Sequence, residues 1–270
     1  MDSNVKLHII VYSSESRAAC EEGYLALDNV DNERPDWREY WPIRRFLLNT
    51  ELQPDTLYGF FSPKFKSKVG LSPAEVVGFI RNSDRNAQVF TFSPQPDMGA
   101  FFLNVFEQNE LFDPGFLGMA QELLTTVGYE VDLGSLVMDS RHTVFSNYIV
   151  ATRAFWIAWL ELCEKIFHFC ERGGTALANQ MNGGTTYQGI PRKVFLIERI
   201  APLLLRTARW SIHPYNTFAC AWSALGTSRF PQEAVISDAL KLAYNELKFP
   251  EYYAGFSEIR KKVFFPNSQE

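Results

Sequence analysis

Polar side chains gather where three apolar runs of this 270-residue chain end, near residues 12, 61 and 92. Exposed backbone amides and a lysine can hold a diphosphate, and a carboxylate can hold a ribose or a metal ion. These turns are therefore candidate ligand contacts, with ordinary serine and proline turns as the alternative. The residues are Tyr12, Ser13 and Ser14 in the first turn, Ser62 and Lys64 in the second, and Ser93 and Asp97 in the third.

A second candidate is one acidic residue inside an apolar helical pattern. Glu198 lies among the aliphatic residues between Val194 and Leu205. Burial would raise the pKa of such a carboxyl group and suit it to act as a base, whereas an ion pair with Arg192 or Arg199 would make it structural. Both interpretations stay open.

Further polar groups could meet the hydroxyls of a sugar. A helical pattern over residues 101–108 carries polar residues three and four apart, which places them on one stripe, and a solvated helix face is the alternative. A strand expected over residues 143–151 has polar residues in its middle, where they cost free energy unless hydrogen-bonded. The two sets are Asn104, Glu107 and Gln108, and Ser146, Asn147 and Tyr148.

Residues 37–45 mix aromatic and basic side chains at helical spacing. They could form an aromatic, cationic wall beside a ligand, and a surface helix with two buried tryptophans is the alternative. The residues are Trp37, Arg38, Tyr40, Trp41, Arg44 and Arg45.

The elements that position these residues alternate between strand and helix. Apolar, β-branched or aromatic runs predict strands at 6–12, 57–61, 88–92 and 143–151. Between them, Ser13 and Ser72 stand where helix caps are expected, the latter followed by Pro73 and Glu75. Helices are predicted over 154–169 and 192–207, and the glycine-rich stretch 173–189 is predicted to be a functional or mobile loop. This order indicates an α/β fold with its polar turns along one edge of the sheet.

Composition narrows the function classes. The net charge of −5 and the pI near 5.5 argue against a protein that wraps nucleic acid. No apolar run has the roughly 18 to 20 residues that a membrane helix needs, and no signal-peptide pattern opens the chain, so we expect a soluble, cytoplasmic protein. The chain has no GxGxxG after a strand, no phosphate loop and no GxSxG elbow, so no organic cofactor is predicted.

Two segments resemble glycosyltransferases of bacterial capsule and O-polysaccharide gene clusters. Residues 146–151, Ser-Asn-Tyr-Ile-Val-Ala, followed by Phe155 and Trp156, are similar to the Asn-Tyr-Phe-Val-Ala strand of those proteins, which precedes an aromatic helix. Residues 195–200, Phe-Leu-Ile-Glu-Arg-Ile, are similar to their closing Glu-Arg-Leu helix. The resemblance implies a GT-A-like, Rossmann-like mixed sheet flanked by helices. We expect a catalytic domain over residues 1–210 and a helical C-terminal extension over 211–270.

The resemblance also implies an activity, which moves a sugar from a nucleotide-activated donor to a carbohydrate or lipid-linked glycan acceptor. Asp97 and Glu198 are then the candidate bases, Lys64 and the strand-end residues would hold the donor, and the two polar sets would hold the acceptor or sugar. Many GT-A enzymes hold Mg²⁺ or Mn²⁺ with an Asp-x-Asp motif that this chain lacks, which leaves Asp97 or Asp139 as metal ligands. Peripheral contact with a membrane is compatible with a lipid-linked acceptor.

Two other functions stay open on the sequence. One is a non-catalytic carbohydrate- or protein-binding partner in a polysaccharide assembly complex. The other is a different nucleotide-dependent transferase on the same kind of sheet.

Overall fold

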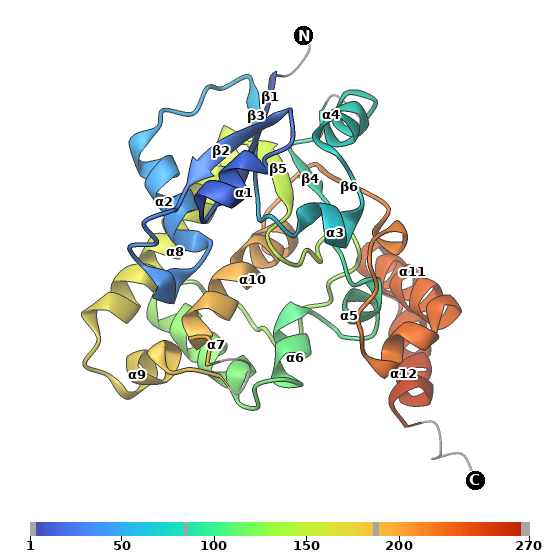
Figure 1. Cartoon of the computed structure of the whole chain (residues 1–270). Helices are drawn as coiled ribbons and strands as arrows, with labels where there is room; N and C mark the ends of the chain where they lie inside the picture. Colours follow the sequence, from blue (N-terminus) through green and yellow to red (C-terminus); the bar gives the residue numbers. More distant parts are fainter. Residues whose placement is uncertain (1–3, 84–85, 186–188, 266–270) are drawn as a thin grey trace.

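A mixed six-stranded sheet forms the centre of the computed structural model, which describes residues 4–83, 86–185 and 189–265. The strand order is β2-β1-β3-β5-β4-β6, and β5 alone runs against the other strands (Figure 1). The predicted α/β class is confirmed, and the sheet is consistent with a Rossmann-like fold. The strands are β1 (Asn4–Val11), β2 (Tyr24–Asp28), β3 (Thr56–Phe61), β4 (Val89–Thr91), β5 (Ile149–Thr152) and β6 (Ile212–Pro214).

Helices cover both faces of this sheet. The helices are α1 (Ser14–Ala18), α2 (Tyr40–Asn49), α3 (Phe65–Val69), α4 (Pro73–Arg81), α5 (Pro96–Ala100), α6 (Val105–Glu110), α7 (Phe116–Thr126), α8 (Arg153–Arg172), α9 (Ala176–Asn182), α10 (Arg192–Thr207), α11 (Pro231–Leu247) and α12 (Pro250–Phe264), with 3₁₀ turns at η1 (Pro35–Trp37), η2 (Thr217–Ala219) and η3 (Gly226–Arg229).

Side chains that alternate along β1 and β3 enter two different apolar cores. Leu7 and Phe61 pack with α3 and α4 on one face, whereas Ile10 and Phe60 pack with α2, α7, α8 and α10 on the other. Such a two-sided strand buries both rows of side chains, which explains its near-continuous apolar run. Large aromatic residues fill both cores, so the aromatic excess of the chain is largely structural.

The predicted helix starts are confirmed by side-chain hydrogen bonds. Ser13 and Ser72 each accept from a backbone amide at the third helical position and complete a capping box, for α1 and α4 respectively. The helix predicted at 192–207 is α10, and the one predicted at 154–169 is the longer α8.

Three local predictions are wrong in part. The strand expected from residue 143 begins only at Ile149, because Ser146 and Asn147 have left-handed backbones (φ 61° and 51°) that form a turn. The helix expected over 101–108 begins at Val105, with Asn104 as its N-cap. The loop expected over 173–189 contains α9, and its residues 186–188 lie outside the described residues.

The C-terminal part of the chain contributes to the sheet before it becomes helical. β6 pairs with β4, so the sheet continues beyond residue 210, where the helical extension was expected to begin. The pair α11 and α12 then packs beside α5 at one side of the molecule, around a small core that includes Phe101 and Ala234 (Figure 1). Within the three described ranges, no helix combines the length and the apolar character needed to cross a membrane.

Candidate functional site

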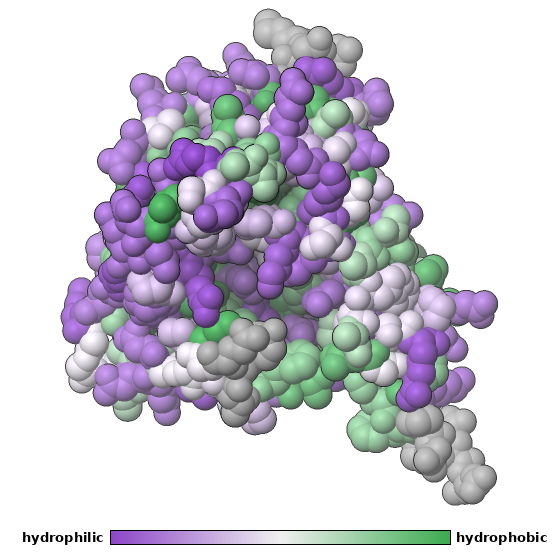
Figure 2. Space-filling model, in the orientation of Figure 1, coloured by the Kyte–Doolittle hydropathy of each residue, from purple (hydrophilic) through white to green (hydrophobic). Residues whose placement is uncertain are grey.

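A groove with two lobes opens along the edge of the sheet where the parallel strands end. The first lobe has a volume of about 660 Å³ and the second about 330 Å³. Lys68, Ser146, Phe195 and Glu198 line both lobes, so the two are adjacent. The face of the molecule drawn in Figure 2 is hollowed near its centre, with hydrophilic residues around the opening.

The topology of the sheet explains this position. From β1 the chain continues to β2 on one side, and it later adds β3 on the other side, so the strand order reverses between β1 and β3. The crevice outside such a reversal is where α/β folds bind ligands. Tyr12 follows β1 there, and Ser62 and Lys64 follow β3. Because β5 runs the opposite way, the turn before it, at Ser146, lies at the same edge.

Two carboxyl groups that the chain separates widely both line the first lobe. Glu39 precedes α2, and Glu198 lies on α10. Burial, and next the negative charge of Glu198, raise the pKa of Glu39 to about 7, against the effect of Lys68, a hydrogen bond with Ser62, and Lys64. Burial also raises the pKa of Glu198, although Arg199 and Lys68 lower it. Raised pKa values of this kind suit carboxyl groups to accept or donate a proton.

The raised pKa of Glu39 has a consequence for stability that can be measured. A carboxyl group whose pKa rises on folding binds its proton more tightly in the folded state than in the unfolded state. Protonation therefore stabilises the fold at low pH, and this stabilisation is lost as pH rises through the window from about 4.5 to 7. Glu39→Gln removes this ionisation. We expect the melting temperature of the variant to exceed that of the parent by a few degrees more at pH 8 than at pH 5.

Thermal unfolding at the two pH values measures this difference. Glu161→Gln is the control, because Glu161 is exposed on α8 and does not line the groove. A melting-temperature difference for Glu39→Gln that stays the same at pH 5 and pH 8 would contradict the assignment.

Basic side chains supply positive charge to the first lobe. Lys64 is the N-cap residue of α3, and Lys68 lies on that helix. Both line the lobe, as does Arg38, which precedes α2. Nζ of Lys68 donates to Oγ of Ser146 at 2.8 Å and lies 5.8 Å from the ring centre of Tyr148. These groups suit a phosphate-bearing ligand.

Unusual backbone conformations concentrate around the groove. Within the described residues, six residues other than glycine have a positive φ, and five of them line one of the two lobes. Left-handed backbone is unfavourable for such residues and clusters at ligand sites, where the surrounding structure enforces it. The five are Asn32, Arg38, Gln95, Ser146 and Asn147.

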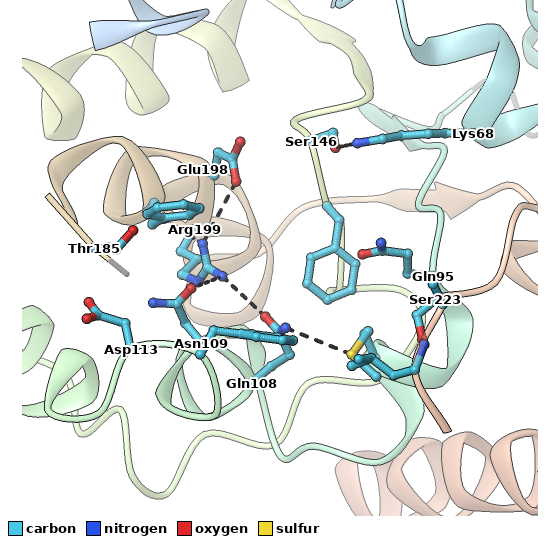
Figure 3. Close-up of a pocket in the computed structure, with 16 residues that line it drawn as sticks. Lys68, Gln95, Gln108, Asn109, Asp113, Ser146, Thr185, Glu198, Arg199 and Ser223 are labelled. Carbon is cyan, nitrogen blue, oxygen red and sulfur yellow. Dashed lines mark hydrogen bonds and ion pairs between the residues drawn. The ribbon is translucent and has the colours of Figure 1, made fainter. Parts of the chain in front are cut away.

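Arg199 organises the floor of the second lobe. Its guanidinium donates to the carbonyl oxygens of Val105 and Phe195, at 2.9 and 2.8 Å. It also donates to the side-chain oxygens of Gln108 and Asn109, at 3.2 and 2.8 Å (Figure 3). Burial lowers the pKa of Arg199 to about 10, so it stays charged at neutral pH.

The structure distinguishes between Arg192 and Arg199 as the predicted ion-pair partner of Glu198. Arg192 pairs with Asp113 at 2.7 Å, not with Glu198. The closest approach of Arg199 to Glu198 is 3.9 Å, and 38% of the Glu198 side-chain surface is accessible. Glu198 is therefore held near a cation but open to the groove.

Of the residues predicted to be catalytic or to bind a ligand, seven line the groove and Tyr148 supports it. The Tyr148 hydroxyl is buried and lies 2.8 Å from Oγ of Ser62. The seven are Tyr12, Ser62, Lys64, Gln108, Ser146, Asn147 and Glu198. Trp37, Arg38 and Tyr40 of the predicted aromatic and cationic wall line the first lobe as well.

Other predicted ligand-binding residues stabilise the fold and do not line either lobe. Ser13 caps α1, where Ser14 is the first helical residue. The buried Ser93 hydroxyl accepts from the backbone amide of Phe145. Asn104 caps α6, and Glu107 pairs with Arg260 at 2.9 Å.

The two aspartates predicted as a base or as metal ligands already have their partners. Asp97 is fully buried, and its carboxylate accepts hydrogen bonds from the amide and hydroxyl of Ser223 and from the hydroxyl of Thr227. Asp139 pairs with Arg141 at 2.9 Å. Although burial opposes it, hydrogen bonds from His142 and Arg141 hold the pKa of Asp139 well below its usual range. Neither residue lines the groove.

The residues present do not offer a divalent cation a site of the predicted kind. The oxygens of Asp97 and Asp139 are occupied by protein donors. Across residues 4–83, 86–185 and 189–265, no group of three or more His, Cys, Asp and Glu side chains is placed to hold a metal ion.

Sequence reasoning missed Glu39, Lys68, Gln95 and Asn109. One signal was readable, since Lys64 and Lys68 are four residues apart on a short helix and so share a face. Glu39 and Asn109 had no comparable local signal, because only tertiary packing brings them to the groove.

Comparisons of the chain with protein-family models, curated proteins and solved structures found no match.

Proposed function

We propose that the chain is a glycosyltransferase that moves a sugar from a nucleotide-activated donor to a carbohydrate acceptor. One observation carries the proposal. The carboxyl groups of Glu39 and Glu198, both with raised pKa values, line one groove with Lys64 and Lys68 at the reversal of strand order. Proton transfer and stabilisation of a leaving phosphate are the two tasks that such a group of residues can perform.

The two segments that resemble capsule and O-polysaccharide glycosyltransferases support the same proposal. They are distant in the chain, yet both contribute to the groove, Ser146 and Asn147 from one and Phe195 and Glu198 from the other. A mixed sheet with one opposed strand agrees with the GT-A-like sheet of the resemblance. Synthesis of bacterial surface polysaccharide is accordingly the proposed setting.

The chemistry assigned to these residues is a displacement at the anomeric carbon. The acceptor hydroxyl oxygen forms a bond to that carbon, while the bond from the carbon to the donor phosphate breaks and its electron pair leaves with the nucleoside diphosphate. The hydroxyl proton goes to the carboxylate of Glu198. Lys64 and Lys68 offset the negative charge that grows on the leaving diphosphate, so no step is assigned to a metal ion.

Nucleotide binding tests this proposal most directly. Calorimetry with UDP-, GDP-, CMP- and dTDP-sugars is expected to give binding for at least one of them. Lys68→Met removes a charged hydrogen-bond donor worth about 1.5 to 3 kcal/mol, so affinity for that nucleotide sugar should fall roughly 10- to 100-fold. Lys165→Met is the control, because Lys165 is exposed on α8.

Binding of none of the nucleotide sugars would overturn the proposal and favour a non-catalytic partner. The same measurement with nucleoside triphosphates and S-adenosylmethionine has a separate outcome. Tight binding of one of those alone would assign the groove to another class of transferase.

A further inference from the structure

The second lobe of the groove differs chemically from the first. Arg199, the cation on its floor, is engaged within the protein, where it donates to four oxygens. Its other cation, Lys68, lies at the boundary with the first lobe, which Lys64 and Arg38 also line. The rest of the lining combines amides, aromatic rings, hydroxyls, aliphatic side chains and the two carboxylates of Asp113 and Glu198, and its neutral polar and aromatic members include Gln95, Gln108, Asn109 and Phe145. This lining suits a neutral, hydroxyl-rich ligand better than a phosphate.

Arg199 fixes the direction of two amides in this lobe. A guanidinium can only donate hydrogen bonds, so the side-chain oxygens of Gln108 and Asn109 must face it and their NH₂ groups must point away. Nε2 of Gln108 makes a long contact, of 3.9 Å, to the sulfur of Met98 (Figure 3).

Asn109 has a polar atom without a partner among the described residues. The residue is 4% exposed, and within residues 4–83, 86–185 and 189–265 its buried Nδ2 has no hydrogen bond. An unmade hydrogen bond at a buried donor costs about 1 to 3 kcal/mol, and folded proteins seldom leave one without water or a ligand. Because Asn109 lines the second lobe, an acceptor oxygen on a bound molecule would satisfy this donor.

The size of the lobe and the position of Glu198 narrow the ligand further. A volume of about 330 Å³ lies at the small end for ligand sites and suits one sugar ring, with aromatic rings against its apolar face. Glu198 lines both lobes, so its carboxylate is placed to take the proton of a hydroxyl in the second lobe at the boundary with the first.

We propose that the second lobe is the acceptor subsite, that it binds a neutral pyranose, and that Asn109 donates a hydrogen bond to one of its hydroxyls. The inference rests on the proposed glycosyl transfer. The first lobe, with Lys64 and Arg38, then holds the nucleotide diphosphate of the donor.

Asn109→Asp tests the subsite with a minimal change. The variant keeps the size of the side chain and an oxygen for Arg199, and it replaces the unpartnered donor by an acceptor. The probes are the methyl glycosides of glucose, galactose, mannose and N-acetylglucosamine, titrated by NMR. At least one should bind the parent protein, and Asn109→Asp should weaken that binding roughly 10-fold, which corresponds to one hydrogen bond.

Two matched variants locate the effect. Lys64→Met should weaken nucleotide-sugar binding and leave glycoside binding within twofold of the parent. Asn179→Asp, at an exposed position on α9, should change neither.

The outcomes separate the subsite from the proposed function. If nucleotide sugars bind but no glycoside does, or if Asn109→Asp binds glycosides like the parent, the subsite is overturned and glycosyl transfer stands. If a glycoside binds through Asn109 but no nucleotide sugar binds, glycosyl transfer is overturned and the lobe is a carbohydrate-binding site in its own right.

Discussion

Glu198→Gln is expected to lower the rate of sugar transfer by about 10² to 10⁴-fold, the usual contribution of a positioned general base. The amide keeps the size of the side chain, but it cannot take the proton of the acceptor hydroxyl. Nucleotide-sugar affinity should change little, because the phosphates are assigned to Lys64 and Lys68. The measurement is release of nucleoside diphosphate from the bound nucleotide sugar, with a methyl glycoside as acceptor.

The pH profile of the parent protein gives the same prediction a second readout. Burial raises the pKa of Glu198, so the rate should fall on acidification at a pH above the ordinary carboxyl range. The residual rate of Glu198→Gln should lack that fall. Glu161→Gln should keep both the rate and the profile. Full activity in Glu198→Gln would remove Glu198 from the chemistry and leave Glu39 as the remaining carboxyl group of the first lobe.

The parts of the fold that local chemistry determines were predictable from sequence. β1, β3 and β4 carry buried apolar runs, and the capping serines stand directly before their helices. β2 and β6 were missed because each is short and lies at an edge of the sheet, where few of its side chains are buried. Of the five residues of β2 only Leu27 is buried, and β6 has three residues, none of them buried. Their pairing with longer neighbours, not their own sequence, makes them strands.

The candidate site was predictable where it follows directly from a strand end, and where a polar residue interrupts an apolar pattern, as at Ser146 and Glu198. Tyr12, Ser62 and Lys64 lie in the groove for the first reason. Asp97 was misleading, because a carboxylate in a polar turn has the same local sequence whether it meets a ligand or, as here, the amide and hydroxyl of Ser223. Asn104 was misleading in the same way, since its side chain caps a helix.

Arg199→Met is the second large effect, and it falls on stability. The apolar side chain would leave the buried oxygens of Val105, Gln108 and Asn109, and the part-buried carbonyl oxygen of Phe195, without the guanidinium donor. Breaking a buried charged network in this way destabilises a protein by about 3 to 5 kcal/mol. For a domain somewhat smaller than this chain, each kcal/mol of lost stability lowers the melting temperature by roughly 2 to 4 °C. We therefore expect the melting temperature of Arg199→Met to fall by about 10 °C.

Thermal and urea unfolding measure this loss, with Arg172→Met, at the exposed end of α8, as a control that should be nearly neutral. The melting temperature of Arg199→Lys should lie between those of Arg199→Met and Arg172→Met, because one ammonium group cannot reach all four acceptors in the directions of a planar guanidinium. If Arg199→Lys folds, the side-chain amides of Gln108 and Asn109 are free to rotate. Glycoside binding should then weaken, while nucleotide-sugar binding persists. A melting temperature of Arg199→Met equal to that of the parent would show that the amides of the second lobe are held in place without Arg199.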